Sequence, residues 1–264
     1  MSRVLLTRPR MRSSEGDELH RILHGAGIAI EELPMIRFEW PVELRELDLA
    51  LNRAARGEFE AILLSSPTAV NFFEERAREL GLFEPLRHAA RFGTVGAATA
   101  KELALLKIET AIPVPNHGGS QKLAAILAES NLAGSRVLLL QSNIGLDVLE
   151  LALRELGATP ERVTLYYTEG PSVADAARLV KLLESDARPD VIAFFSPSAV
   201  HQCIRALAEM SSGLLHRLPA LAAIGETTAR AIEDTLHRRP EIVARKADQE
   251  SLATDILHFL QTKG

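Results

Sequence analysis

Hydroxyl and glycine residues recur where an apolar stretch gives way to a helical pattern. After the apolar stretches 61–64 and 191–195 comes a serine that can cap a helix, followed by a proline suited to the first helical turn. Glycines with nearby threonines follow the apolar runs 91–95 and 221–224. The residues at all these turns are Ser65, Ser66, Gly96, Thr99, Gly118, Gly119, Ser120, Ser196, Ser198, Gly225, Thr227 and Thr228.

Such turns suit the binding of an anion. The start of a helix offers backbone N–H groups without helical partners and the positive end of the helix dipole. In a parallel sheet all strand-to-helix turns lie at the edge where the strands end, which is where α/β proteins bind ligands. Any single turn is explained as well by a routine helix cap. Taken together in both halves, the turns indicate two cradles for an anion with many oxygens.

Two further pairs of residues carry chemistry. Tyr166 and Tyr167 lie on a predicted strand, 163–168, that passes between the halves of the chain, so one of them could face an inter-domain cleft. A phenol can donate a proton without a metal, but alternation along a strand lets only one tyrosine face a given side, and at least one should be a half-buried strand aromatic. Arg8 and Arg10 follow the first predicted strand and are candidates to pair with carboxylates; solvated loop charges are the alternative.

Other chemistries find little support in the residues. Neither G-x-G-x-x-G nor G-x-x-x-x-G-K-[ST] occurs, so no nucleotide site and no cofactor is expected. His20 and His24 have helical spacing but are interpreted as part of a solvated helix face, and no metal site is predicted. The single cysteine, Cys203, excludes an intrachain disulfide and is interpreted as a small core residue rather than a nucleophile.

Composition narrows the class of protein. The net charge of −5 argues against a protein that binds nucleic acid through bulk charge. It does not argue against a protein that holds a small anion at the starts of its helices. No apolar run approaches the ~18 residues of a membrane span, and no long apolar signal core begins the chain. We expect a cytoplasmic protein without nucleic-acid or membrane partners and, because no coiled-coil pattern is present, a monomer.

The chain contains an internal duplication. The stretches around Ser66 and Ser196, the stretches around Gly96 and Gly225, residues 4–9 and 137–142, and residues 123–126 and 252–255 match in the same order at an offset of about 130 residues. Short apolar strands alternate with helices throughout, which is typical of parallel sheets covered on both faces. The sequence therefore predicts an α/β protein of two three-layer domains with parallel sheets. The expected strands are 3–7, 28–33, 61–65, 91–95, 110–114, 136–140, 163–168, 191–195, 221–224 and 241–244, and the expected helices include 43–56, 120–129, 145–156, 173–184 and 250–261.

Over essentially its whole length the chain resembles the uroporphyrinogen-III synthase family. No single motif is diagnostic, but the ordered set is specific, above all FFSPS together with IGETTA. The motifs are residues 4–9 (VLLTRP), 64–67 (LSSP), 95–100 (VGAATA), 165–168 (LYYT), 194–198 (FFSPS) and 223–229 (AIGETTA).

The resemblance implies a domain organisation and a reaction. It implies one discontinuous domain of residues 1–36 and 169–264, a second domain of 37–168, and a two-stranded connector made of 36–40 and 164–168. The implied reaction closes hydroxymethylbilane into uroporphyrinogen III with loss of water and inversion of the terminal pyrrole ring. Tyr166 aligns with the tyrosine that assists departure of hydroxide, although the neighbouring Tyr167 leaves the choice between them open.

The resemblance also implies how the substrate is held. The turn residues, with Arg8 and Arg10 as additional candidates, are expected to contact it, largely through backbone groups; the side-chain candidates are Ser65, Ser66, Thr99, Ser196, Ser198, Thr227 and Thr228, beside Gly96 and Gly225. The upstream hydroxymethylbilane synthase is a candidate partner. The competing class is a non-catalytic two-domain clamp for a small anion. An exported clamp would need a signal segment, and none is recognised in this sequence. A clamp that carries a flavin would be expected to have an aromatic residue near a phosphate loop, and none lies at such a loop.

Overall fold

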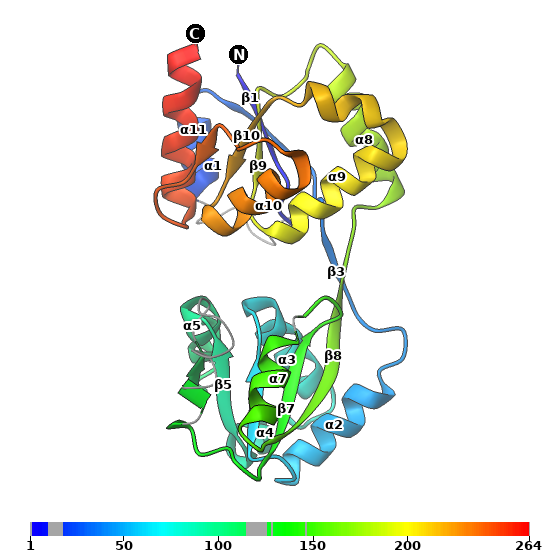
Figure 1. The fold of residues 1–264 in the computed structure, drawn as a ribbon, viewed down its shortest axis with the longest axis vertical. Helices are drawn as coiled ribbons and strands as arrows, with labels where there is room; N and C mark the ends of the chain where they lie inside the picture. The colour runs from blue at the N-terminus through cyan, green and yellow to red at the C-terminus, as the bar shows by residue number, and fades with distance from the viewer. Residues whose placement is uncertain (1, 10–17, 115–125, 128, 146, 264) are drawn as a thin grey trace. The chain divides into compact units, whose positions relative to one another are not determined.

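The computed structural model describes the chain except for residues 1, 10–17, 115–125, 128, 146 and 264. The chain divides into two compact units (Figure 1). Unit 1 comprises Met1–Arg37 and Glu169–Gly264, and unit 2 comprises Phe38–Thr168. Each unit is built around its own sheet. In both sheets, the strand pairs whose direction the structure defines are parallel.

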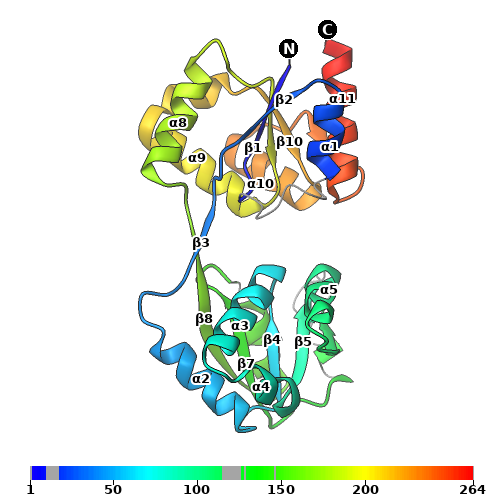
Figure 2. The ribbon, with the colours of Figure 1, turned by 180° about the vertical axis from the view of Figure 1, so that it is seen from behind.

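Unit 1 has a five-stranded sheet in the order β11-β10-β9-β1-β2. On one face α1 and α11 lie side by side and contribute Leu19, Leu23 and Leu252 to a core with the strand residues; α8 and α9 cover the other face (Figures 1 and 2). The strands are β1 (Arg3–Leu6), β2 (Ala29–Glu32), β9 (Val191–Phe194), β10 (Ala220–Ala223) and β11 (Ile242–Val243). The helices are α1 (Glu18–Gly25), α8 (Val173–Glu184), α9 (Pro197–Ser211), η1 (Ser212–Arg217), α10 (Glu226–Leu236) and α11 (Gln249–Lys263).

Unit 2 has a six-stranded sheet in the order β3-β8-β7-β4-β5-β6. Helices α2 to α5 pack on one face around Phe73, Phe92 and Leu138, and α7 packs on the other around Leu63 and Leu139. The strands are β3 (Arg37–Glu39), β4 (Ala61–Leu64), β5 (Arg91–Val95), β6 (Thr110–Val114), β7 (Arg136–Ser142) and β8 (Thr159–Glu169). The helices are α2 (Arg45–Ala55), α3 (Pro67–Glu79), α4 (Phe83–Ala89), α5 (Ala97–Leu105) and α7 (Val148–Glu155).

The two units repeat one local plan. Strands β4 and β9 are buried along their whole length and are followed by a Ser-Pro helix start. Ser66 Oγ accepts the N–H of Ala69 at 3.0 Å, and Ser196 Oγ accepts that of Ala199 at 3.2 Å. Both serines are therefore N-caps, as their sequence predicts. The α/β class with parallel sheets is confirmed.

Two expected elements differ from the structure in their bounds, and a third lies mostly outside the described residues. The strand expected over 163–168 is longer, because β8 begins at Thr159, where it already pairs with Arg136 at the start of β7. The helix expected over 145–156 begins only at Val148, since the residues before it form a turn that is tied to β8. The helix expected over 120–129 lies mostly outside the described residues, as do Gly118, Gly119 and Ser120.

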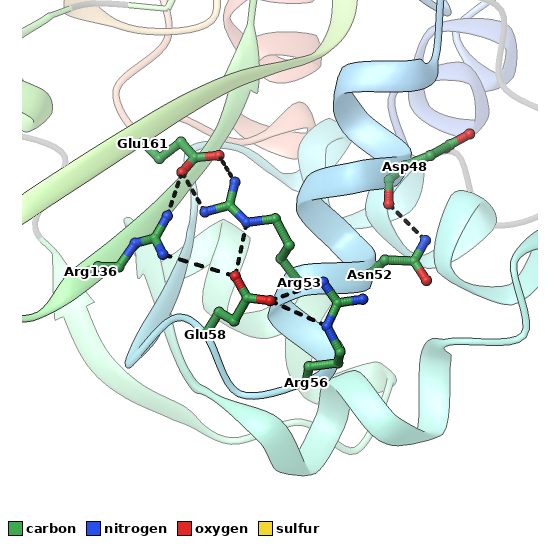
Figure 3. A network of polar contacts seen from close by, with 7 residues as sticks. All are labelled: Asp48, Asn52, Arg53, Arg56, Glu58, Arg136 and Glu161. Carbon is green, nitrogen blue, oxygen red and sulfur yellow. Dashed lines mark hydrogen bonds and ion pairs between the residues drawn. The ribbon is translucent and has the colours of Figure 1, made fainter.

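A network of charges ties together the end of unit 2's sheet where β7 and β8 begin, called here the amino edge (Figure 3). Glu161 accepts two hydrogen bonds from Arg53, at 2.6 and 3.0 Å, and one from Arg136 at 3.1 Å. Glu58 accepts hydrogen bonds from Arg53 and from Arg56. The guanidinium groups of Arg53 and Arg136 lie 5.0 and 5.1 Å from the centre of the buried Phe59 ring. Charge pairing and cation–π contact together fix α2 to the start of these strands.

Candidate functional site

Strand β8 directs its two tyrosines to different environments. The Tyr166 side chain is buried, with the residue 5% exposed, whereas Tyr167 is 39% exposed. The ring of Tyr166 stacks on Phe72 of α3, with centroids 5.0 Å apart, and meets the edge of Phe38 at 5.5 Å. The alternation expected along this strand is confirmed. Tyr166 is thus a rigidly held aromatic of unit 2.

The hydroxyl of Tyr166 lies at the edge of unit 2's sheet where the strands end, the carboxyl edge. Its oxygen is 3.0 Å from Ser66 Oγ, at the start of α3. Burial raises the pKa of the phenol above its usual value, and hydrogen bonds with Ser66, Ser142 and Thr68 only partly oppose that effect. Tyr166 is therefore a protonated donor at neutral pH.

Asn143 fixes the backbone around this tyrosine. Its own N–H donates to the Tyr166 carbonyl at 3.1 Å, and its side-chain oxygen accepts the N–H of Thr168 at 2.8 Å. The β7–β8 register shifts just before, between Gln141 and Ser142. Asn143 thus extends the hydrogen bonding between β7 and β8 beyond the end of β7. Its two bonds hold the backbone of β8 at Tyr166 and Thr168, and so they support the inward orientation of Tyr166. The sequence analysis did not identify Asn143; its only local signal is a polar residue at a strand end.

The other predicted residues of unit 2 serve mainly the helix starts. Gly96 is the N-cap of α5 with φ of 81°, a conformation that favours glycine. Thr99 is almost fully buried, and its hydroxyl donates to the Val95 carbonyl at 2.7 Å. Ser65, before the Ser66 cap, is half-buried. At α5 the backbone N–H groups therefore remain the better anion donors, since the Thr99 hydroxyl is already used.

In unit 1 the first predicted residue, Arg8, is buried rather than solvated. It is 5% exposed, its guanidinium lies 5.2 Å from the centre of the Phe195 ring, and its Nη2 is 3.5 Å from Glu32. Burial lowers the pKa of Arg8, although the nearby Glu32 carboxylate acts in the opposite direction. The same Glu32 oxygen lies 2.9 Å from Nε2 of the half-buried His20. The interpretation of His20 as part of a solvated face is therefore wrong, while His24 is exposed.

The remaining predicted residues of unit 1 follow the neighbouring strands β9 and β10. Ser198 is half-buried in the first turn of α9, after the Ser196 cap. Gly225 begins α10 in an extended conformation; Thr227 is exposed there and Thr228 is buried. Because β10, β9 and β1 are consecutive in the sheet, these turns and Arg8 share one edge of unit 1. Arg10 lies outside the described residues.

Other reactive groups of the described chain stay structural. Cys203 is fully buried in α9, and burial raises its pKa to about 12, which confirms it as a core residue without a thiolate at neutral pH. The residues that the structure describes contain no group of three histidine, cysteine or carboxylate side chains that could hold a metal. Among the same residues, no helix has both the length and the apolar character needed to cross a bilayer.

Known proteins with a similar sequence carry one name. The sequence profile described as "Uroporphyrinogen-III synthase HemD" matches residues 17–254. A uroporphyrinogen-III synthase of Chlorobaculum parvum is 25% identical over 99% of this chain and all of its own length. One of Proteus mirabilis is 29% identical over 62% of this chain and 78% of its own length.

Solved structures share the fold. A mutant uroporphyrinogen III synthase of Thermus thermophilus superposes with a TM-score of 0.69 at 20% identity, covering 99% of this chain and 100% of its own. The Helicobacter pylori enzyme gives a TM-score of 0.62 at 16% identity, covering 98% of this chain and 100% of its own. Because the sequence profile spans most of the chain, the chain belongs to the uroporphyrinogen-III synthase family.

Proposed function

We propose that this chain closes hydroxymethylbilane into uroporphyrinogen III with Tyr166 as the proton donor for the leaving hydroxyl. Membership of a family of lyases in tetrapyrrole biosynthesis makes the chain an enzyme and removes the non-catalytic clamp as an alternative. The observation that carries the role of Tyr166 is its buried, protonated phenol 3.0 Å from the Ser66 cap at the carboxyl edge of unit 2.

The protons balance without a cofactor. Tyr166 gives its proton to the hydroxymethyl oxygen, the carbon–oxygen bond breaks, and water leaves. The pyrrole ring system supplies the electrons for this step, and the methylene carbon left behind bonds to the substituted α-carbon of the terminal ring, which gives the spiro intermediate. The bond from that α-carbon to its original methylene bridge then breaks, and the bridge bonds to the unsubstituted α-carbon of the same ring, which inverts the ring. The proton lost from this second α-carbon, as the ring regains aromaticity, returns to the phenolate. Hydroxymethylbilane thus gives uroporphyrinogen III and one water, and the enzyme ends unchanged.

Ser66 can orient the phenolic proton. Its oxygen already accepts the N–H of Ala69, and it has a single proton of its own. When Ser66 donates that proton to the Tyr166 oxygen, the Tyr166 proton is left for the substrate. The developing phenolate then keeps this hydrogen bond from Ser66, and the pKa of Tyr166 shows the same influence, since this bond lowers it.

Selectivity for the type III isomer must come from orientation. Closure without ring inversion needs no enzyme, so the protein has to favour the spiro intermediate by holding the chain in the matching geometry. Helix starts in both units offer N–H groups to the substrate's carboxylates, and the buried Arg8 adds a fixed positive charge. The proposed contacts are Arg8, Arg10, Ser65, Ser66, Gly96, Thr99, Ser196, Ser198, Gly225, Thr227 and Thr228.

The cellular setting belongs to the proposal as well. We expect the two compact units to be the two domains, with boundaries at residues 36–37 and 168–169. We also expect a cytoplasmic monomer that receives hydroxymethylbilane from its synthase. Size-exclusion chromatography with light scattering, with and without that synthase, tests both the monomer and the partner.

The assay that tests the function separates the porphyrin isomers. Freshly generated hydroxymethylbilane is supplied, the products are oxidised, and type I is resolved from type III. Mostly type III isomer is expected. A type I product identical to the enzyme-free control would overturn the proposed function.

A further inference from the structure

Gln141, at the end of β7, is a buried polar residue with an unused hydrogen-bond donor. The residue is 3% exposed, and its side-chain nitrogen Nε2 has no hydrogen-bond partner in the part of the chain that the structure describes. Buried amides in native proteins are nearly always paired. A buried donor left without a partner costs about 1–3 kcal/mol, so its retention calls for an explanation.

Its position distinguishes Gln141 from Arg87 and Gln202, which also have a buried polar atom without a partner among the described residues. Arg87 leaves only Nε unpaired, because both of its terminal nitrogens are hydrogen-bonded, and Gln202 lies within helix α9. Gln141 instead stands at the carboxyl edge, one residue before Ser142, whose hydroxyl bonds to Tyr166. It is also one position beyond the register pair Leu140 and Leu64, and hence level with Ser65 on the neighbouring strand.

The turn after β7 is shaped to admit this side chain. A Cβ at Gly145 would lie 2.5 Å from the amide carbon and oxygen of Gln141, so a side chain at this point would displace the amide from its observed position. Arg162 of β8 holds the Gly145 carbonyl at 2.9 Å and also pairs with Asp147. The protein therefore fixes the loop around an amide whose nitrogen has no hydrogen-bond partner among the described residues.

The internal duplication gives the same position a polar residue in the other unit. Residues 4–9 match residues 137–142 in sequence, so Arg8 of unit 1 and Gln141 of unit 2 are equivalent positions of the duplication. Arg8 lies just beyond the end of β1, Gln141 lies at the end of β7, and both are buried. One copy presents a cation, the other a neutral donor.

We propose that Nε2 of Gln141 donates a hydrogen bond to a carboxylate of the tetrapyrrole, as the counterpart of Arg8. The inference rests on the proposed function. Pyrrole N–H groups are themselves donors, and the hydroxymethyl oxygen is the group assigned to Tyr166, so the carboxylates are the acceptors that remain for an amide nitrogen. A neutral amide contributes less to the binding of a carboxylate than a guanidinium does, and it adds no charge beside the Tyr166 phenol.

Two substitutions at this position test the inference, with the KM for hydroxymethylbilane and the Kd for uroporphyrinogen III as readouts. Gln141→Met keeps the volume and removes the donor; KM and Kd should rise about tenfold. Gln141→Glu places a carboxylate against a carboxylate and should raise both further. The melting temperature of Gln141→Met should stay level or rise, because a buried unpaired donor is gone.

Gln202→Met is the matched control. It removes another buried amide atom without a partner, so its melting temperature should also stay level or rise, while KM stays at the wild-type value. An unchanged KM and Kd in Gln141→Met would overturn the inference, as would a smaller effect of Gln141→Glu than of Gln141→Met. Failure of both Gln141 variants to fold would assign the amide a structural role and overturn it too. If the wild-type enzyme makes no type III isomer, that result refutes the proposed function instead. The ratio of the variant Kd to the wild-type Kd for uroporphyrinogen III still tests whether Gln141 binds the tetrapyrrole.

Discussion

The two edges of unit 2's sheet handle polar groups in opposite ways. At the amino edge the carboxylates of Glu58 and Glu161 accept hydrogen bonds from three arginines, two of which also lie over Phe59 (Figure 3). At the carboxyl edge two buried donors have no such acceptors among the described residues. The Gln141 amide nitrogen and the Thr94 hydroxyl are buried without partners among the described residues.

The difference has a physical basis in the direction of a parallel sheet. Helices begin after the carboxyl ends of strands, so their unpaired N–H groups and positive dipoles gather at that edge. Acidic side chains placed there would occupy these donors and repel a substrate rich in carboxylates. At the amino edge the charges satisfy one another. Paired charges thus indicate stability at one edge, and unused donors indicate binding at the other.

The largest expected effect is a loss of kcat when the phenol at the carboxyl edge is removed. Tyr166→Phe keeps the stacking on Phe72 and removes the proton donor, so kcat for type III formation should fall about 100-fold without reaching zero. Tyr167→Phe is the matched control, and kcat should stay near wild type because Tyr167 is partly exposed and the hydroxyl beside Ser66 is that of Tyr166. A stopped assay with isomer separation measures both variants. Full activity of Tyr166→Phe, or loss of activity only in Tyr167→Phe, would contradict the assignment.

A smaller effect is expected from loosening the support of that phenol. Asn143→Ala removes the acceptor for the Thr168 N–H and should lower kcat about tenfold with little change in KM. Asn143→Asp keeps an acceptor and should restore most of the loss. In the Tyr166→Phe background, Asn143→Ala should have almost no further effect on kcat, because both changes act through one group. Additive losses in the double variant would show that Asn143 acts elsewhere.

Much of the fold was predictable because the local signals are strong and repeated. Ser66 and Ser196 cap helices where the Ser-Pro pattern places them, and apolar runs such as 61–64 are buried strands. Gly96 precedes a helix that begins at Ala97, as its place at a strand-to-helix turn predicts. These features depend on residues close in sequence, so a single chain reveals them.

The site was less predictable because its geometry depends on contacts between distant strands. Asn143 acts on β8 through a shifted register, which no local pattern signals. His20 was misread because its partner, Glu32, lies on another element. The unused donor of Gln141 is defined by the absence of a neighbour, and only a structure can show that. Which tyrosine is buried followed only once β8 was placed in the sheet.

The amino edge should respond in stability alone. Glu161→Gln weakens three hydrogen bonds from Arg53 and Arg136 and should lower the free energy of unfolding by about 1 kcal/mol, a modest loss because these groups are partly solvated. The kcat should not change. Glu209→Gln, which breaks a single exposed pair with Arg205 at 3.8 Å, should leave stability unaltered. Urea denaturation compares the two variants, and a loss of activity in Glu161→Gln without a loss of stability would undo the contrast between the edges.

The smallest effect is expected from alkaline pH, and it follows from the burial of Tyr166. Burial raises the pKa of the phenol, so folding favours its neutral form. This contribution to stability is complete below the ordinary tyrosine pKa of about 10 and is lost as pH rises through the folded-state pKa. The kcat for type III formation should therefore show no loss from Tyr166 between pH 7 and about 10. An alkaline decline near pH 8 that disappears in Tyr166→Phe would mean that the phenol ionises too easily to be the buried donor of this edge.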